Sequence, residues 1–287
     1  MKSFCVKTNN SRIINYLLKN FEKISLDNTY ISIKKFKHFN NIILHYTGNE
    51  ELKFSNFLSN TITKTIIDLC EEDIICKDLS LNYFYFNAQE KKKILDNVIA
   101  LIKDNSALRY DLINNEVYKK ICVSHSLYLQ AFIDFNLTNY NDFINAQIDL
   151  GVNKFLIDKE YIEFVNILKL YVKSETEYTQ TDHLHLIYKD KTSTIIDDNK
   201  NIINCNENLK KAKYVSDISF SSNDYALNTL LNLVPRKITI HLIDGYTDEF
   251  INTLKLIFQD KVQICEDCDI CLFYKANSRP VSTDLHF

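Results

Sequence analysis

The fold is decided by a stretch late in the chain, His183-Leu184-His185-Leu186-Ile187-Tyr188. Apolar and polar side chains alternate along it, which is the period of two typical of a half-buried β-strand. A turn sequence, Lys189-Asp190-Lys191, follows, and the residues from Thr192 to Ile196 can form a returning strand. We therefore predict a β-hairpin, which ends the helical pattern of the preceding residues.

Helices and strands alternate after this hairpin. The pattern predicts a helix opening near Ser222, a strand over Ile238 to Ile243, a helix from Thr247 and a strand over Val262 to Ile264. Strands separated by helices usually form a sheet that the helices cover. We therefore predict that residues 180–276 fold together as a mixed α/β sheet with a hairpin, whose last strand ends at a cysteine cluster, and that residues 277–287 form a tail.

Residues 55–174 carry a helical period almost throughout. Asn87 and Glu90 form a capping pair before one predicted helix, and Asp158 precedes another. An aromatic stripe in this region is interpreted as core or helix-packing surface; its members are Tyr128, Phe132, Phe135 and Tyr140. We predict several helices packed on one another.

The first 54 residues predict a small basic β-α-β-β unit. Phe4 to Val6 is a short apolar run, Ser11 can cap a helix, and the segments from Tyr30 to Phe36 and from Ile42 to Tyr46 alternate like paired strands. Together the parts predict an α+β fold: this N-terminal unit, the central helical region and the C-terminal mixed sheet.

Composition limits the class of protein. Hydrophobic residues make up 46% of the chain and charged residues 25%, which is typical of a packed globular protein. The first residues show no apolar signal segment, and no stretch approaches the ~20 apolar residues that cross a bilayer. We expect no membrane span, a cytoplasmic location, and reduced thiols among the eight cysteines.

Charge disfavours nucleic acid as the main partner, because the net charge is -3. The charge is nevertheless uneven, with ten Lys/Arg and four Asp/Glu in residues 1–64. Lys34, Lys35 and Lys37 alternate with apolar residues, so they could contact phosphates or could guard a solvated sheet edge.

Glycine scarcity excludes several enzyme classes. With glycine only at Gly48, Gly151 and Gly245, the chain contains no dinucleotide-binding G-x-G-x-x-G, no Walker A loop and no G-x-S-x-G. No His-Glu-x-x-His zinc-protease motif is present either. The sequence assigns no catalytic residue and favours binding over catalysis.

The most specific chemical feature is the cluster of Cys265, Cys268 and Cys271. A Cys-x-x-Cys pair can hold one Zn²⁺ or iron, and the third cysteine can add a ligand if the chain turns after Cys265. His241, Cys205 or solvent could supply the fourth ligand. The sequence therefore predicts a metal site, with Zn²⁺ or an iron–sulfur cluster as the cofactor.

Two other interpretations of the cysteines stay open, a redox dithiol and three unligated structural thiols. Acidic neighbours such as Asp267 and Asp269 are expected to raise the pKa of the thiols, which disfavours redox chemistry and favours a cation. His183 and His185 point to one face of a regular strand, where they could also bind metal or could belong to an ordinary half-exposed strand.

Several segments in the second half of the chain resemble the YtxC-like family in order and spacing. They are Leu129 to Leu137, Phe155 to Phe164, the hairpin from His183 to Asp198, and Pro235 to His241 leading to the cysteine cluster. The resemblance implies a protein associated with endospore formation. The family offers no assigned activity, cofactor or catalytic residue that could be transferred to these positions.

We therefore expect a sporulation protein that acts by binding an unknown protein partner, a small ligand or a metal. The alternative is an enzyme, or a metal or redox protein, with its site near His241 and the cysteine cluster, since ligands often bind at strand ends of α/β sheets. A third possibility is an anion binder that uses the N-terminal lysines.

Overall fold

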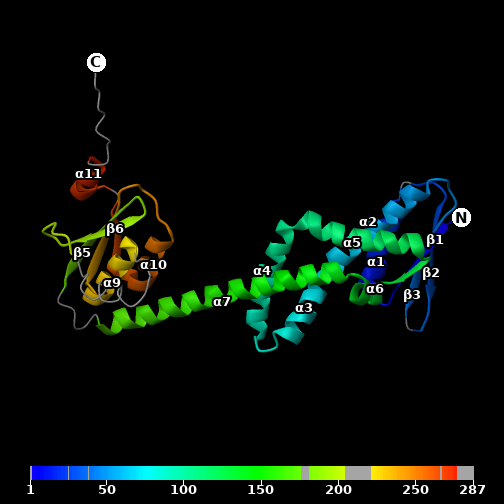
Figure 1. Ribbon diagram of the computed structural model, residues 1–287, viewed down its shortest axis with the longest axis horizontal. Coiled ribbons are helices and arrows are strands. Elements are labelled where there is room, and N and C mark those ends of the chain that lie inside the picture. The colour runs from blue at the N-terminus through cyan, green and yellow to red at the C-terminus, as the bar shows by residue number, and fades with distance from the viewer. Residues whose placement is uncertain are drawn as a thin grey trace, which may run out of the picture. The chain divides into compact units, whose positions relative to one another are not determined.

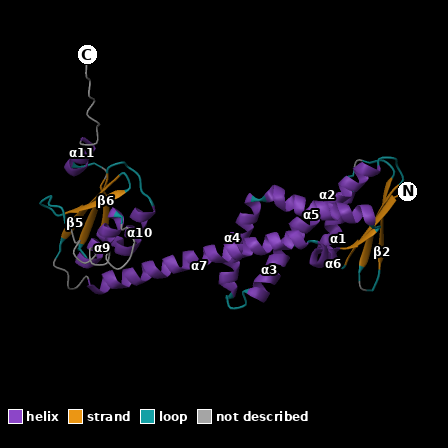
Figure 2. Cartoon of the chain, viewed as in Figure 1, coloured by secondary structure: helices purple, strands orange, loops and turns teal. Residues whose placement is uncertain are grey.

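The computed structural model describes residues 2–24, 26–37, 39–175, 181–203, 221–265 and 267–276 (Figure 1). Within these ranges it contains ten α-helices and two four-stranded sheets (Figure 2). The predicted α+β class is confirmed. Contacts divide the chain into an N-terminal unit, Met1–Asp158, and a C-terminal unit, Lys159–Phe287.

The sheet of the N-terminal unit has the strand order β2-β3-β1-β4. Strands β1 (Lys2–Thr8), β2 (Thr29–Lys35) and β3 (Asn40–Tyr46) pair antiparallel as β2-β3-β1, and the three-residue β4 (Ser126–Tyr128) pairs parallel with β1. The predicted pairing of β2 and β3 is confirmed. Strand β4 was not predicted, because three residues are too few to show a period.

Seven helices accompany this sheet. The first six are α1 (Ser11–Phe21), α2 (Glu51–Leu69), α3 (Glu71–Asn82), α4 (Ala88–Asp104), α5 (Ser106–Val123) and α6 (Leu129–Asn136). The capping box of α4, made by Asn87 and Glu90, is confirmed. The predicted cap of α1 is wrong by one residue, because the side chain of Asn10 accepts the backbone N–H groups of Arg12 and Ile13.

One hydrophobic core joins the sheet and these helices, running from Phe4 to Phe155. The boundary drawn at residue 54 from the sequence falls inside this core. Phe132 and Tyr140 of the aromatic stripe are buried as predicted. Tyr128 and Phe135 are 43% and 80% exposed, so for these two residues the prediction is wrong. Tyr128 belongs to β4 and not to a helix, which breaks the spacing of the stripe.

The seventh helix, α7, spans Thr138–Glu175 without interruption. No helix begins at Asp158, contrary to the prediction. The physical reason is that neither glycine nor proline follows Gly151 before the end of the helix, so nothing stops the helix from continuing through the aspartate.

The C-terminal unit is built on a sheet of order β6-β5-β7-β8. Strands β5 (His183–Lys189) and β6 (Thr192–Ile196) form the predicted hairpin, and β7 (Lys237–Leu242) and β8 (Val262–Cys265) extend the sheet in parallel. Helices α9 (Ser222–Leu233) and α10 (Glu249–Phe258), followed by the 3₁₀ turn η2 (Gln259–Lys261), connect the strands. The predicted mixed sheet is therefore confirmed.

The two faces of this sheet are covered differently. Side chains of one face, among them Leu184, Leu186, Ile238 and Ile240, share a core with α9, α10 and the last turns of α7. The other face carries a much smaller buried cluster of Ile187, Ile196, Ile243 and Cys271. Cys271 lies on α11 (Asp269–Ala276), a short helix that the sequence pattern did not predict.

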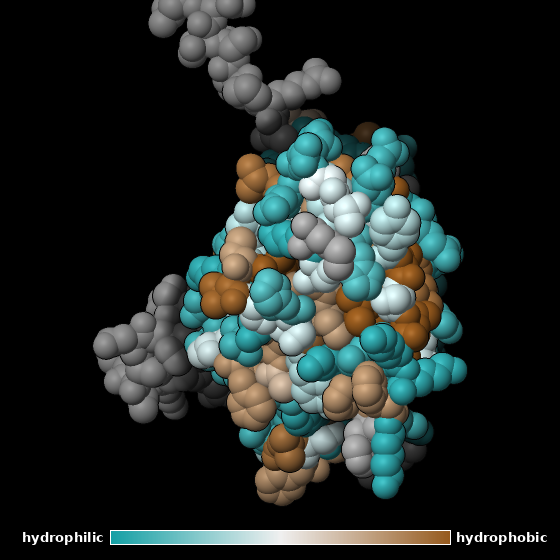
Figure 3. Space-filling view, turned by 90° about the vertical axis from the view of Figure 1, so that its right-hand side faces the viewer, coloured by the Kyte–Doolittle hydropathy of each residue, from teal (hydrophilic) through white to brown (hydrophobic). Residues whose placement is uncertain are grey.

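The surface mixes polar and apolar side chains. Figure 3 shows this for the side of the molecule that lies to the right in Figure 1. The strands of the N-terminal sheet contain four lysines and no acidic residue, and Lys34, Lys35 and Lys37 are exposed. Among the described residues, no helix combines the length and the apolar character needed to cross a bilayer.

Candidate metal centre

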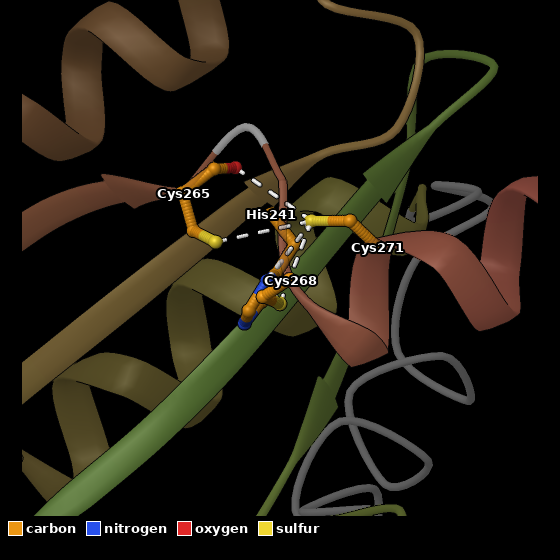
Figure 4. Close-up of side chains that lie close together, drawn as sticks. All are labelled: His241, Cys265, Cys268 and Cys271. Carbon is orange, nitrogen blue, oxygen red and sulfur yellow. Dashed lines mark hydrogen bonds between the residues drawn. The ribbon is translucent and has the colours of Figure 1, made fainter.

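Four side chains named from the sequence converge on one point beside the C-terminal sheet (Figure 4). His241 comes from β7, Cys265 from the end of β8, Cys268 from the following turn and Cys271 from α11. Each offers one ligand atom, and these atoms all lie within 4.8 Å of one another. A single ion could therefore contact all four.

Strand register places the first two ligands. β7 and β8 run parallel with His241 opposite Cys265, so both side chains project from the same face of the sheet. The chain then leaves β8, and α11 begins at Asp269. This is the turn that the sequence interpretation required. It brings Cys268 and Cys271 to the same side, because residues three apart are neighbours on a helical turn.

Four of the six separations between the ligand atoms are close to those around a tetrahedral ion. Sγ of Cys271 lies 3.9 Å from Sγ of Cys265 and 3.8 Å from Sγ of Cys268. Nδ1 of His241 lies 3.4 Å from the sulfurs of both Cys268 and Cys271. Zinc–sulfur bonds of ~2.3 Å and zinc–nitrogen bonds of ~2.1 Å at tetrahedral angles require about 3.8 Å and about 3.6 Å.

The same distances also test two other interpretations of the cysteines, a disulfide and an iron–sulfur cluster. Sulfurs 3.8 and 3.9 Å apart are not bonded, since a disulfide holds them at ~2.05 Å, and all three cysteines are free thiols. A four-iron cluster binds each cysteine through a different iron, which would spread the sulfurs much more widely. A mononuclear ion fits the geometry better than a cluster.

The thiol pKa values differ from the sequence expectation. Burial raises the pKa of Cys271 to about 12, assisted by its contacts with Cys268 and Cys265, and burial also raises that of Cys265. The pKa of Cys268 is lowered: burial acts to raise it, but the backbone N–H of Cys271, the thiols of Cys265 and Cys271, and the backbone N–H of Ile270 act together to lower it. The expected rise is therefore wrong for Cys268, because these hydrogen-bond donors stabilise a thiolate there.

His241 is suited to be a neutral nitrogen ligand. It is 2% exposed, and burial, followed by the proximity of His185 and His183, lowers its pKa to about 4. A neutral imidazole offers one lone pair to a metal ion, and Nδ1 is the ring nitrogen that faces the sulfurs of Cys268 and Cys271.

A second group of polar side chains lies beside the first. His183 and His185, which the sequence placed on one strand face, both contact Oδ1 of Asp198, and Nδ1 of His185 lies 2.9 Å from Nε2 of His241. Asp198 and this link between the strands were not predicted from the sequence. The alternation of His183, His185 and His241 on two strands was the available signal, but the parallel register of β5 and β7 was needed to bring them together.

The remaining ligand candidate, Cys205, lies outside the described residues. The four side chains that do converge can hold a cation in a closed shell, and three adjacent reduced thiols could alternatively undergo oxidation. Within the described ranges, all members of the group belong to the C-terminal unit.

Comparison with known proteins is consistent with the resemblance read from the sequence. The chain matches the model of the YtxC-like family over residues 56–263, which is more than half of its length. Among curated proteins and among solved structures, nothing matches the chain. On this match, the chain belongs to the YtxC-like family.

Proposed function

We propose that His241, Cys265, Cys268 and Cys271 bind one structural Zn²⁺ ion, in a non-enzymatic protein that acts in endospore formation by binding another protein. The observation that carries the metal part is the convergence of three sulfurs and one imidazole nitrogen at separations suited to a tetrahedral ion. The match to the YtxC-like family supports the proposed role in endospore formation.

The ligand set favours zinc in a structural role. Thiolates and imidazole are preferred by Zn²⁺, and four protein ligands complete its tetrahedral shell. A catalytic zinc keeps one position for water or substrate, and this arrangement leaves none. His241 and Cys271 are buried, which further separates the ion from solvent.

The proposed ion would fasten α11 to the sheet. Counted over the described residues, the buried cluster beneath α11 contains four side chains, whereas the core on the opposite face of the sheet contains sixteen. Such a small cluster contributes little burial energy, and metal ligation is the usual means by which small elements are held in place. The helix could then present its exposed Leu272 and Phe273 to a partner.

Metal analysis of the reduced full-length protein tests the zinc proposal. Protein purified without oxygen is expected to contain close to one zinc per chain, and Cys268→Ser is expected to lose it. Cys76→Ser is the matched control, because Cys76 is an exposed thiol on α3 of the other unit. Metal-free wild-type protein with all thiols reduced and native stability would refute the proposal, as would a disulfide within the cluster.

A genetic experiment tests the biological part. Deleting the gene in its spore-forming host is expected to reduce the number of heat-resistant spores, and the wild-type and Cys76→Ser genes should restore it while Cys268→Ser should not. Affinity capture during sporulation should recover the partner. An unchanged spore count after deletion would contradict the assignment to endospore formation.

A further inference from the structure

Beyond the four proposed ligands, the structure contains a continuous series of polar contacts that begins at His241. Nε2 of His241 lies 2.9 Å from Nδ1 of His185, and Nε2 of His185 lies 3.1 Å from Oδ1 of Asp198. The same oxygen lies 2.7 Å from Nδ1 of His183, whose Nε2 is 2.8 Å from Oγ1 of Thr239.

We infer that His185 and Asp198 are positioning residues for the metal centre: they fix the proton of His241 on Nε2 and so keep Nδ1 free to bind the ion. This inference rests on the proposed zinc centre and extends it to the β5–β6 hairpin. Histidine ligands commonly donate their second N–H to an acceptor that orients the ring.

The direction in which hydrogen bonds are donated along these contacts follows from Asp198. A carboxylate can only accept, so His185 must donate from Nε2, and a neutral His185 then presents a lone pair at Nδ1. That lone pair requires a proton on Nε2 of His241. With the opposite tautomer of His241, His185 would turn a lone pair toward the carboxylate at 3.1 Å, which is repulsive.

His183 completes the same arrangement without conflict. It donates from Nδ1 to Asp198, and its Nε2 accepts the hydroxyl proton of Thr239. One assignment of protons thus satisfies every contact in the group. Asp198 receives two N–H donors, which aim its carboxylate toward the two rings.

A second metal ion held by His183, His185 and Asp198 is the competing explanation, since three ligand atoms also meet there. The distances decide against it. Nitrogen and oxygen ligands at ~2.1 Å from a tetrahedral ion are about 3.4 Å apart. The 2.7 and 3.1 Å contacts to Asp198 are those of hydrogen bonds.

Two measurements on the full-length reduced protein test the inference. In the metal-free protein labelled with ¹⁵N-histidine, long-range NMR couplings are expected to show the proton on Nε2 in both His241 and His185. Competition with a chelator, using zinc alone, is expected to show about 10- to 100-fold weaker binding for Asp198→Ala and His185→Leu. Asp198 is 61% exposed, so the first variant should fold normally.

The matched control is Asp182→Ala, which removes an exposed carboxylate adjacent to the same strand and should leave zinc affinity unchanged. A proton on Nδ1 of His241, or wild-type affinity in both folded variants, would overturn the inference. So would two zinc ions per wild-type chain with one lost in Asp198→Ala. A wild-type chain that binds no zinc would instead count against the proposed function, since the tautomers are read without metal.

Discussion

Cys268 shows how a single position can differ from its sequence context. Asp267 and Asp269 flank it, and on charge alone they should disfavour a thiolate. Hydrogen bonds from the backbone N–H of Cys271 and from the neighbouring thiols instead help to lower its pKa. Of the three cysteines, Cys268 is therefore the one whose pKa is lowered, which favours the thiolate form that binds metal.

A partly buried ion pair gives a prediction at the residue scale in the N-terminal unit. Arg109 Nη1 lies 2.9 Å from Oε1 of Glu71, and the hydroxyl of Tyr140 donates to Oε2 of the same carboxylate. Burial raises the pKa of Glu71, although Arg109 and Tyr140 act to lower it. Glu71→Ala is expected to cost ~3 kcal/mol, because it leaves the Arg109 charge unpaired.

Hydrogen exchange of peptides from α2 and α5 measures the stability that Glu71→Ala is expected to lose. Tyr140→Phe, which removes one hydrogen bond to a charged group, should cost about 1.5 kcal/mol. Glu72→Ala is the control, since the exposed neighbour should change protection by less than about 0.5 kcal/mol. Equal protection in Glu71→Ala and Glu72→Ala would show that the ion pair contributes nothing.

At the scale of elements, the start of α10 gives a pH-dependent prediction. Asp248 caps this helix: it accepts the N–H of Ile251 and the hydroxyl of Tyr188. Burial acts to raise the pKa of Asp248, but these hydrogen bonds hold it below its usual value. A carboxyl with a lowered folded-state pKa stabilises the fold above its unfolded pKa, and this stabilisation is lost as the pH falls through the folded value.

Asp248→Ala is therefore expected to destabilise α10 by ~1 kcal/mol at neutral pH. The difference from wild type should shrink below pH ~4, where the carboxyl protonates. Urea unfolding followed by circular dichroism at several pH values measures this difference, and acid release of any metal affects both proteins alike. If the difference in unfolding free energy between wild type and Asp248→Ala stays constant down to pH ~2, Asp248 does not act as a charged cap.

Close contact between α4 and α7 gives a second prediction at this scale. A Cβ atom on Gly151 would lie 2.5 Å from Cγ2 of Val98 and 3.3 Å from its backbone nitrogen. Gly151→Ala should therefore destabilise the N-terminal unit by ~1 kcal/mol, although alanine favours helix by about the same amount elsewhere. Adding Val98→Ala should recover part of the loss in a double-mutant cycle. Stabilisation by Gly151→Ala alone would refute the close approach.

Elements with a sustained hydrophobic period were predicted from the sequence. Two short elements, β4 and α11, were not predicted, and the helix start expected inside the long helix α7 was wrong. The hairpin of β5 and β6 and the capping box of α4 follow from local chemistry, and both are present. β4 and α11 are short, and their positions depend on contacts with β1 and with the C-terminal sheet. The three cysteines of the proposed metal site could be named because of their Cys-x-x-Cys spacing. Asp198 could not, because its proposed role depends on β5 lying beside β7.

At the scale of the whole molecule, the proposed ion belongs to one of the two units into which the chain divides. The four ligands lie in the C-terminal unit, while the core from Phe4 to Phe155 contains no member of the group. Removing zinc with a chelator should therefore increase hydrogen exchange in β7, β8 and α11 and leave α2 and α5 unchanged. An equal change in both units, or none in either, would contradict a local structural role.

The most direct test of the central claim is X-ray absorption at the zinc edge of the purified, reduced, full-length protein. The zinc centre predicts three sulfur neighbours at ~2.3 Å and one nitrogen at ~2.0–2.1 Å. His241→Ala should replace or remove the nitrogen and keep the sulfurs, whereas Cys268→Ser, which is expected to lose the ion, should give no zinc signal above background. A wild-type spectrum dominated by nitrogen and oxygen, or protein that takes up no zinc, would contradict the assignment.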